Sequence, residues 1–164
     1  MKIRNIVFAL LLLSGISVSA QRVPVQVDIK LKGEWQVKSV TVERYHMKQG
    51  HLLGKQEITA YDSITTIGGG FLNIVFREDY CIIKQSGGRN AWDYIHADSG
   101  RLELKPVVDS QAPSKETPEH HLRLQYSFGS NGDLFIGPMI SGYMDRSTGV
   151  PVKMKYTCHY TRIK

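Results

Sequence analysis

Residues 120–136, HHLRLQYSFGSNGDLFI, contain the pattern that decides the fold. Every second residue of the first half is apolar, which places these side chains on one face of an extended chain. They are Leu122, Leu124, Tyr126 and Phe128. The dipeptide Asn131-Gly132 follows, and both of its residues tolerate the positive φ angles of a tight turn. Residues 134–139, LFIGPM, return as a second strand, so the stretch predicts a β-hairpin with one apolar face.

Segments of the same kind fill most of the chain. The clearest is 152–163, VKMKYTCHYTRI, in which apolar and polar residues alternate throughout. The others lie at 35–45, 57–67, 71–76, 80–85, 91–96 and 101–105. Eight or nine sequential strands predict an all-β fold, an antiparallel up-and-down barrel of about eight strands, because closing a meander removes its exposed edges. A β-sandwich is the alternative.

The first twenty residues match a secretory signal peptide. Lys2 and Arg4 precede a short apolar run at 6–13, and small residues lead up to a cleavage site after Ala20. The run is shorter than the roughly 20 residues that a membrane helix needs. We therefore expect a mature chain that begins at Gln21 and is secreted or periplasmic. An uncleaved anchor is the alternative.

The rest of the chain has the length and composition of one domain. We expect residues 21–32 to form an extended lead-in and residues 33–164 a single β-barrel domain without a membrane span. The chain carries 21 Lys and Arg against 15 Asp and Glu, and the positive charges are spread along it. Because no basic stripe alternates with aromatic residues, the sequence gives no support to nucleic-acid binding.

The two cysteines, Cys81 and Cys158, are candidates for a disulfide bond. An oxidising compartment permits such a bond. The alternative is a pair of buried thiols that behave as small apolar side chains. Sequence alone does not give the distance between the two Cα atoms, so both interpretations stay open.

Residues 30–40, KLKGEWQVKSV, carry a family resemblance. A Gly-x-Trp motif, Gly33 and Trp35, opens the first strand, and Arg162 stands near the end of the last one. This arrangement resembles the lipocalins and their short bacterial secreted relatives, which are calycin-type β-barrels. The resemblance implies an eight-stranded barrel that binds a small apolar molecule in its interior. It also implies that Gly33, Trp35 and Arg162 are structural, with Trp35 closing one end of the barrel and Arg162 packed across its ring.

Aromatic residues on the apolar faces are the candidates for ligand contact. They are Phe76, Tyr126, Phe128 and Tyr156. In a cavity, such rings would line the wall and the tyrosine hydroxyls would orient the ligand. The alternative is that these rings only fill the core.

No group of residues has the pattern of a catalytic or metal site. The adjacent His120 and His121 would point to opposite faces of a strand, and no His or Cys pair has the spacing of zinc ligands. The chain also lacks a nucleophile motif followed by a helix. We therefore expect no enzymatic activity, no metal and no cofactor.

Two functions are compatible with these observations. The first is a non-catalytic, lipocalin-like binding protein for a small hydrophobic ligand. The second is a protein-binding module, such as a hydrolase inhibitor or an envelope accessory factor, whose partner is a secreted or envelope protein. Such a module would act through its loops, for which the candidates are 46–56, 107–119 and 141–151.

Overall fold

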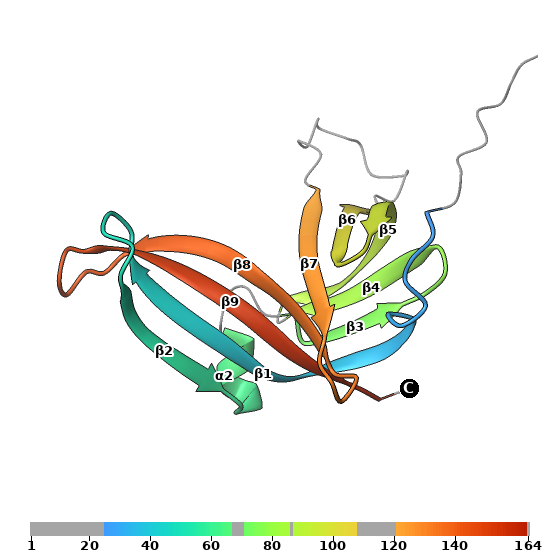
Figure 1. Ribbon diagram of the computed structural model, residues 1–164, viewed down its shortest axis with the longest axis horizontal. Helices are drawn as coiled ribbons and strands as arrows, with labels where there is room; N and C mark the ends of the chain where they lie inside the picture. Colours follow the sequence, from blue (N-terminus) through green and yellow to red (C-terminus); the bar gives the residue numbers. More distant parts are fainter. Residues whose placement is uncertain (1–24, 67–70, 86, 108–120, 164) are drawn as a thin grey trace, which may run out of the picture.

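The structure of the protein is a computed structural model that describes residues 25–66, 71–85, 87–107 and 121–163 (Figure 1). The predicted signal peptide and its cleavage site lie outside these residues. In the described part of the chain, no helix is long and apolar enough to cross a membrane. The elements are β1 Gly33–His46, β2 Leu52–Ile58, α2 Tyr61–Thr66, β3 Asn73–Phe76, β4 Tyr80–Gln85, β5 Gly88–Asp98, β6 Arg101–Pro106, β7 Leu122–Phe128, β8 Leu134–Met144 and β9 Pro151–Arg162.

The strands form a closed antiparallel barrel. Closure comes from the pairing of β1 with β9, and the order around the barrel is β1-β3-β4-β5-β6-β7-β8-β9. The predicted all-β fold and up-and-down barrel of about eight strands are confirmed, with β2 as an additional strand. On the side of β1 away from β9, residues 33–36 pair with β3 and residues 40–45 pair with β2.

Four strands continue beyond the closed barrel as an open sheet, which we call the extension (Figure 1). It consists of β2, the second half of β1, the first half of β9 and the second half of β8, in that order across the sheet. Its two turns lie together, since the amide of Met47 donates to the carbonyl of Pro151 at 2.9 Å. Because side chains alternate between faces, the face that lines the barrel continues onto the extension as its inner face.

The barrel interior is packed with side chains. Those that expose at most 1% of their surface include Trp35, Val40, Ile74, Phe76, Leu104, Leu134, Ile136 and Tyr160. A side chain without accessible surface borders no space that admits water, so this part of the interior is solid. Both polar tips among them are paired, since the Tyr160 hydroxyl donates to the carbonyl of Phe71 at 2.8 Å and the indole N–H of Trp35 donates to the carbonyl of Leu31.

Trp35 is buried near one end of the barrel, which we call the closed end. The expected contact with Arg162 is present, with the guanidinium carbon 4.7 Å from the centroid of the indole ring. The indole N–H donates to the carbonyl of Leu31 at 2.7 Å, and Arg162 donates to the carbonyl of Lys30. The lead-in is not extended throughout, because it turns at 29–31 so that the Leu31 side chain enters the core.

The strand predicted at 57–67 is wrong in its second half, where residues 61–66 form α2. β-Branched residues favour strands on propensity. Here, however, the hydroxyls of Thr65 and Thr66 donate to backbone carbonyls three residues earlier, at 2.7 and 2.8 Å. The helix also brings Ile64 into the core, where it is 1% exposed. Burial in the tertiary structure therefore outweighs the local preference.

Two of the three candidate loops are also wrong in part. Residues 52–56 of the first loop belong to β2, and residues 141–144 of the third loop lengthen β8. These segments contain glycines and are exposed on both faces, so their sequences lack the alternation that predicts a strand. They nevertheless pair with β1 and β9. All of the middle loop except Val107 lies outside the described residues.

The two cysteines form no disulfide. Both Cys81 in β4 and Cys158 in β9 are free thiols in the core. Burial raises the pKa of the Cys81 thiol to about 12 and also raises the pKa of Cys158. Both thiols therefore stay protonated and act as small apolar side chains, which was the alternative interpretation.

A carboxylate–imidazole pair ties the β7–β8 turn to β9 on the outer face of the barrel. Nε2 of His159 lies 2.7 Å from Oδ2 of Asp133, and the side-chain amide of Asn131 donates to the same oxygen at 2.7 Å. The ring of Phe135 stacks on the imidazole at a centroid distance of 4.5 Å. The hydrogen bond from His159, followed by that from Asn131, lowers the pKa of Asp133.

We expect the substitution Asp133→Asn to make unfolding less sensitive to acid. Because the folded-state pKa is lowered, the stabilisation is fully present above the ordinary Asp pKa of about 4 and is lost as the pH falls through the folded-state value. Between about pH 5 and pH 2 the unfolding free energy of the wild type should thus fall more steeply than that of the variant. Urea titrations at each pH measure this, with Asp62→Asn, in an exposed position of α2, as the control. Equal slopes for wild type and Asp133→Asn would contradict the prediction.

Candidate functional site

The structure does not gather the four candidate aromatic residues around one cavity. Phe76 is packed inside the barrel. Tyr126 and Phe128 lie together near the closed end, with ring centroids 5.9 Å apart, and Phe128 also packs on Trp35 at 6.1 Å. Tyr156 lies elsewhere, at the junction between the barrel and the extension, where it pairs with β1 and β8. Three hollows lie around the packed interior in the described part of the chain.

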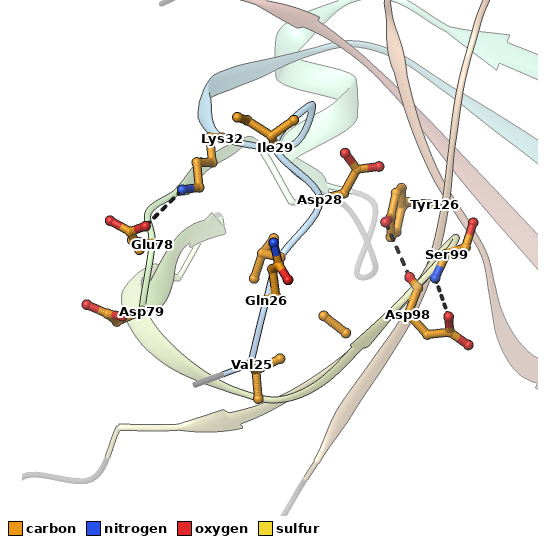
Figure 2. A pocket seen from close by; sticks show the side chains of 12 residues that line it. Val25, Gln26, Asp28, Ile29, Lys32, Glu78, Asp79, Asp98, Ser99 and Tyr126 are labelled. Carbon is orange, nitrogen blue, oxygen red and sulfur yellow. Dashed lines mark hydrogen bonds and ion pairs between the residues drawn. The ribbon is translucent and has the colours of Figure 1, made fainter. Parts of the chain in front are cut away.

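The largest of these three hollows lies at the closed end, between the lead-in and the turns that join β3 to β4 and β5 to β6 (Figure 2). Its volume is about 770 Å³, and Tyr126 lies on its wall. The Tyr126 hydroxyl donates to the carbonyl of Asp98 at 3.3 Å. Burial raises the pKa of Tyr126, so its hydroxyl stays neutral. The one candidate ligand residue that faces this hollow is therefore already bonded to the protein.

Most of the charged groups along the closed-end hollow are carboxylates. The acidic residues along it are Asp28, Glu78, Asp79 and Asp98, and Lys32 is the one cation among its described lining residues. The Lys32 ammonium pairs with Glu78 at 3.1 Å, as Figure 2 shows. This ion pair links the lead-in to the β3–β4 turn. The hollow is thus acidic and does not resemble the apolar pocket that a hydrophobic ligand needs.

A second hollow is a groove of about 330 Å³ on the inner face of the extension, which we call the groove. Its lining combines apolar and polar side chains and comes from β1, β2, β8, β9 and the end of α2. The residues are Val42, Arg44, Gln56, Ile58, Thr66, Tyr143, Met154 and Tyr156. Val42 pairs with Gln56 on one side and with Tyr156 on the other, so the register of three strands places these side chains next to one another. The groove is therefore the open continuation of the barrel interior.

Two polar groups of the groove, the Tyr156 hydroxyl and the Arg44 guanidinium, have defined surroundings. The Tyr156 hydroxyl lies 3.1 Å from Oγ of Ser141, which donates to it, and 3.5 Å from the sulfur of Met154. The guanidinium of Arg44 lies over Gly54, where its Nη2 comes within 3.3 Å of the position that a Cβ would take. Among the described residues, Arg44 has no ion-pair partner. A cation in an apolar groove favours an anionic group on a bound molecule.

The third hollow is a slot in the barrel wall, of about 490 Å³, where β8 leaves β7. β7 pairs with β8 only through residues 126–128, and β8 then bends at Gly137 and Pro138 toward the extension. The rim is charged, and one of its ion pairs joins Arg123 to Glu103 at 3.1 Å. Leu102 and Leu124, which also line the slot, are almost fully buried.

Sequence reasoning predicted one residue of the groove, Tyr156, and missed the others. The strongest signal it could have used is Arg44. Val40, Val42 and Arg44 share one face of β1, so a charged residue follows two apolar ones in the same phase. A charged residue on the otherwise apolar face of a strand indicates either that the core ends there or that a binding site begins there. The remaining lining residues depend on strand register, which the sequence does not specify.

The fold defines the class of protein: a closed, antiparallel, up-and-down β-barrel with a four-stranded extension. Among the described residues, no three His, Cys, Asp or Glu side chains are grouped as a metal site would require. Comparison of the chain with protein-family models, with curated proteins and with solved structures finds no match.

Proposed function

We propose that this protein is a non-catalytic, secreted or periplasmic binding protein for a small apolar molecule that carries one acidic group. The observation that carries the proposal is the groove, in which Val42, Ile58 and Met154 lie beside a guanidinium that has no ion-pair partner among the described residues. The closed barrel and the contact between Trp35 and Arg162 support a lipocalin-like assignment. The ligand position differs from the lipocalin expectation, because packed side chains fill the barrel around Phe76.

The dimensions of the groove limit the ligand. A hollow of about 330 Å³ is at the lower end of the range for small-molecule sites, which is roughly 300–1,000 Å³. It suits a short acyl chain or a single-ring compound. The apolar part would lie along Val42, Ile58 and Met154, and Arg44 would bind the acidic head.

The Tyr156 hydroxyl gives the groove a second polar contact. It accepts a hydrogen bond from Ser141, which leaves its own proton free for a ligand oxygen in place of the weak contact with the sulfur of Met154. This role agrees with the one expected for a tyrosine in a ligand pocket. Tyr156 therefore stays a candidate ligand residue, whereas Phe76 is part of the packed core.

We expect the groove to distinguish octanoate from 1-octanol, which share a chain but differ in charge. Isothermal titration calorimetry should show tighter binding of octanoate by the wild type. The substitution Arg44→Gln should weaken octanoate binding about tenfold or more and remove the difference, because a hydrogen bond to a charged group contributes about 1.5–3 kcal/mol. Arg89→Gln, at an exposed position of β5 away from the groove, is the control.

The same titrations contain the contradicting outcomes. Absence of octanoate binding by the wild type at millimolar concentration would reject a fatty-acid-like ligand. An equal loss in Arg89→Gln and Arg44→Gln would show that general charge attraction, and not the groove, holds the anion.

A second candidate function, protein binding, is favoured by one observation. Large apolar side chains at the outer end of the extension expose between 39% and 58% of their surface, and they are Met47, Leu52, Leu53, Tyr143 and Met144. Exposed apolar groups that gather in one region are typical of protein-interaction surfaces. Such a surface would use the ends of β2 and β8 instead of the loops expected from the sequence. Recovery of a protein partner, with no ligand in the groove, would favour this function.

A further inference from the structure

One long edge of the extension has no neighbour in the described structure. β2 is the outermost strand of the sheet, and it pairs only with β1. An unpaired edge presents backbone N–H and C=O groups that can pair with another strand. Proteins commonly protect such edges with proline, but Leu52–Ile58 contains none. On the opposite edge of the extension, in contrast, Pro138 precedes the unpaired part of β8.

The charges on β2 are arranged so that they complement a second copy of the same strand. Lys55 and Glu57 are two residues apart and therefore lie on the same face, the outer face of the extension. Both residues are exposed. Lys55 pairs with Glu43 of β1 at 3.0 Å, while Glu57 has no ion-pair partner among the described residues.

We propose that β2 is a self-association edge, where the β2 strands of two copies of this chain pair antiparallel around Gln56. A twofold axis perpendicular to the sheet keeps the outer face of one copy beside the outer face of the other. Lys55 of each copy then lies opposite Glu57 of the other, which creates two cross-strand ion pairs. Lys55 would be placed between its own Glu43 and the Glu57 of the second copy.

Other centres for the pairing place the charges unfavourably. A centre at Lys55 would put the two lysines opposite each other, and a centre at Glu57 would do the same for the two glutamates. A centre between neighbouring residues would leave both charges opposite uncharged side chains. Like charges in directly opposed positions destabilise strand pairing, so Gln56 is the favoured centre. There the two Gln56 side chains lie opposite each other on the inner face, where an amide can both donate and accept a hydrogen bond.

The resulting dimer would join two extensions into one continuous sheet. Gln56 and Ile58 line the groove on the inner face of β2, so the two grooves would open on the same side of the joined sheet. The proposal does not depend on what the groove binds.

The test exchanges the two charges separately. Sedimentation equilibrium of the purified protein should show concentration-dependent dimers for the wild type. Lys55→Glu and Glu57→Lys should each weaken dimerisation by a factor of about ten or more, because each substitution turns two attractive pairs into repulsive ones. A mixture of these two variants should form heterodimers with wild-type strength, since the four charges are again complementary. The double exchange K55E/E57K should restore self-association.

Thermal unfolding of each variant provides the control for folding, and Lys153→Glu on the outer face of β9 provides the control for general charge. A wild type that stays monomeric at the highest attainable concentration would overturn the proposal. Dimerisation that all single exchanges leave unchanged would also overturn it, because the contact would then lie elsewhere. Failure of the mixed variants to associate would reject pairing centred on Gln56.

Discussion

Replacing Trp35 with alanine should lower the free energy of unfolding by about 3–5 kcal/mol, the usual cost of truncating a large buried aromatic residue. The indole ring is 1% exposed and packs on Phe128. Its loss also removes the hydrogen bond to the carbonyl of Leu31 and the ring beneath Arg162. The substitution therefore releases the lead-in from the closed end as well as leaving a cavity. Guanidinium chloride titration, followed by circular dichroism, measures the change.

Two further substitutions separate the contributions of Trp35. Trp35→Phe keeps an aromatic ring but loses the N–H donor, and it should cost about 1–3 kcal/mol. Arg162→Met keeps the length of the side chain but loses the cation, and it should cost about 0.5–2 kcal/mol. A loss of less than about 1 kcal/mol for Trp35→Ala would mean that the closed end contributes little to stability.

The second large effect is expected at Gly137, where β8 bends away from β7. The residue has a φ of 136°, and an added Cβ would lie 2.5 Å from the carbonyl oxygen of Tyr156. Gly137→Ala thus combines an unfavourable backbone conformation with a clash against the neighbouring strand β9. We expect a loss of about 3 kcal/mol or more in the free energy of unfolding, measured by urea denaturation.

Gly88 offers a matched control for Gly137. Its φ of 150° is similar, but an added Cβ would have nothing within 4 Å. Gly88→Ala should therefore show the backbone cost alone, about 1–2 kcal/mol. The difference between the two variants measures the close approach of β8 to β9. Equal losses would show that β9 moves to accommodate the methyl group.

The fold was largely predictable from the sequence because most strands have one buried and one exposed face. Residues 122–128 and 152–160 alternate cleanly, and the structure buries the apolar set in each case. β2 was missed for the opposite reason. It lies at an edge of the extension, so both of its faces are partly open and its sequence, LLGKQEI, shows no alternation. Helix α2 was missed because its formation depends on burial of Ile64, a contact made by tertiary structure.

The candidate site was less predictable. The four aromatic residues were chosen because they lie on apolar faces, and three of them belong to the packed barrel or its closed end. What distinguishes Tyr156 is that the closed barrel ends at its position in β9. That boundary depends on where β1 changes its partner from β3 to β2, between residues 36 and 40. Such a change is a property of strand register and leaves no mark on the composition of β1.

The pairing of β1 with β9 also sets the order in which the protein can assemble. The register joins Trp35 to Arg162 and Gln36 to Thr161, so the barrel is closed by its first and last strands, which are far apart in the sequence. A chain still attached to the ribosome cannot complete this seam until β9 has been synthesised and released from the exit tunnel. Pairing between such distant segments carries the highest loop-closure cost and slows folding. Earlier strands can form hairpins during synthesis, but the closed barrel forms only after β9 has left the tunnel.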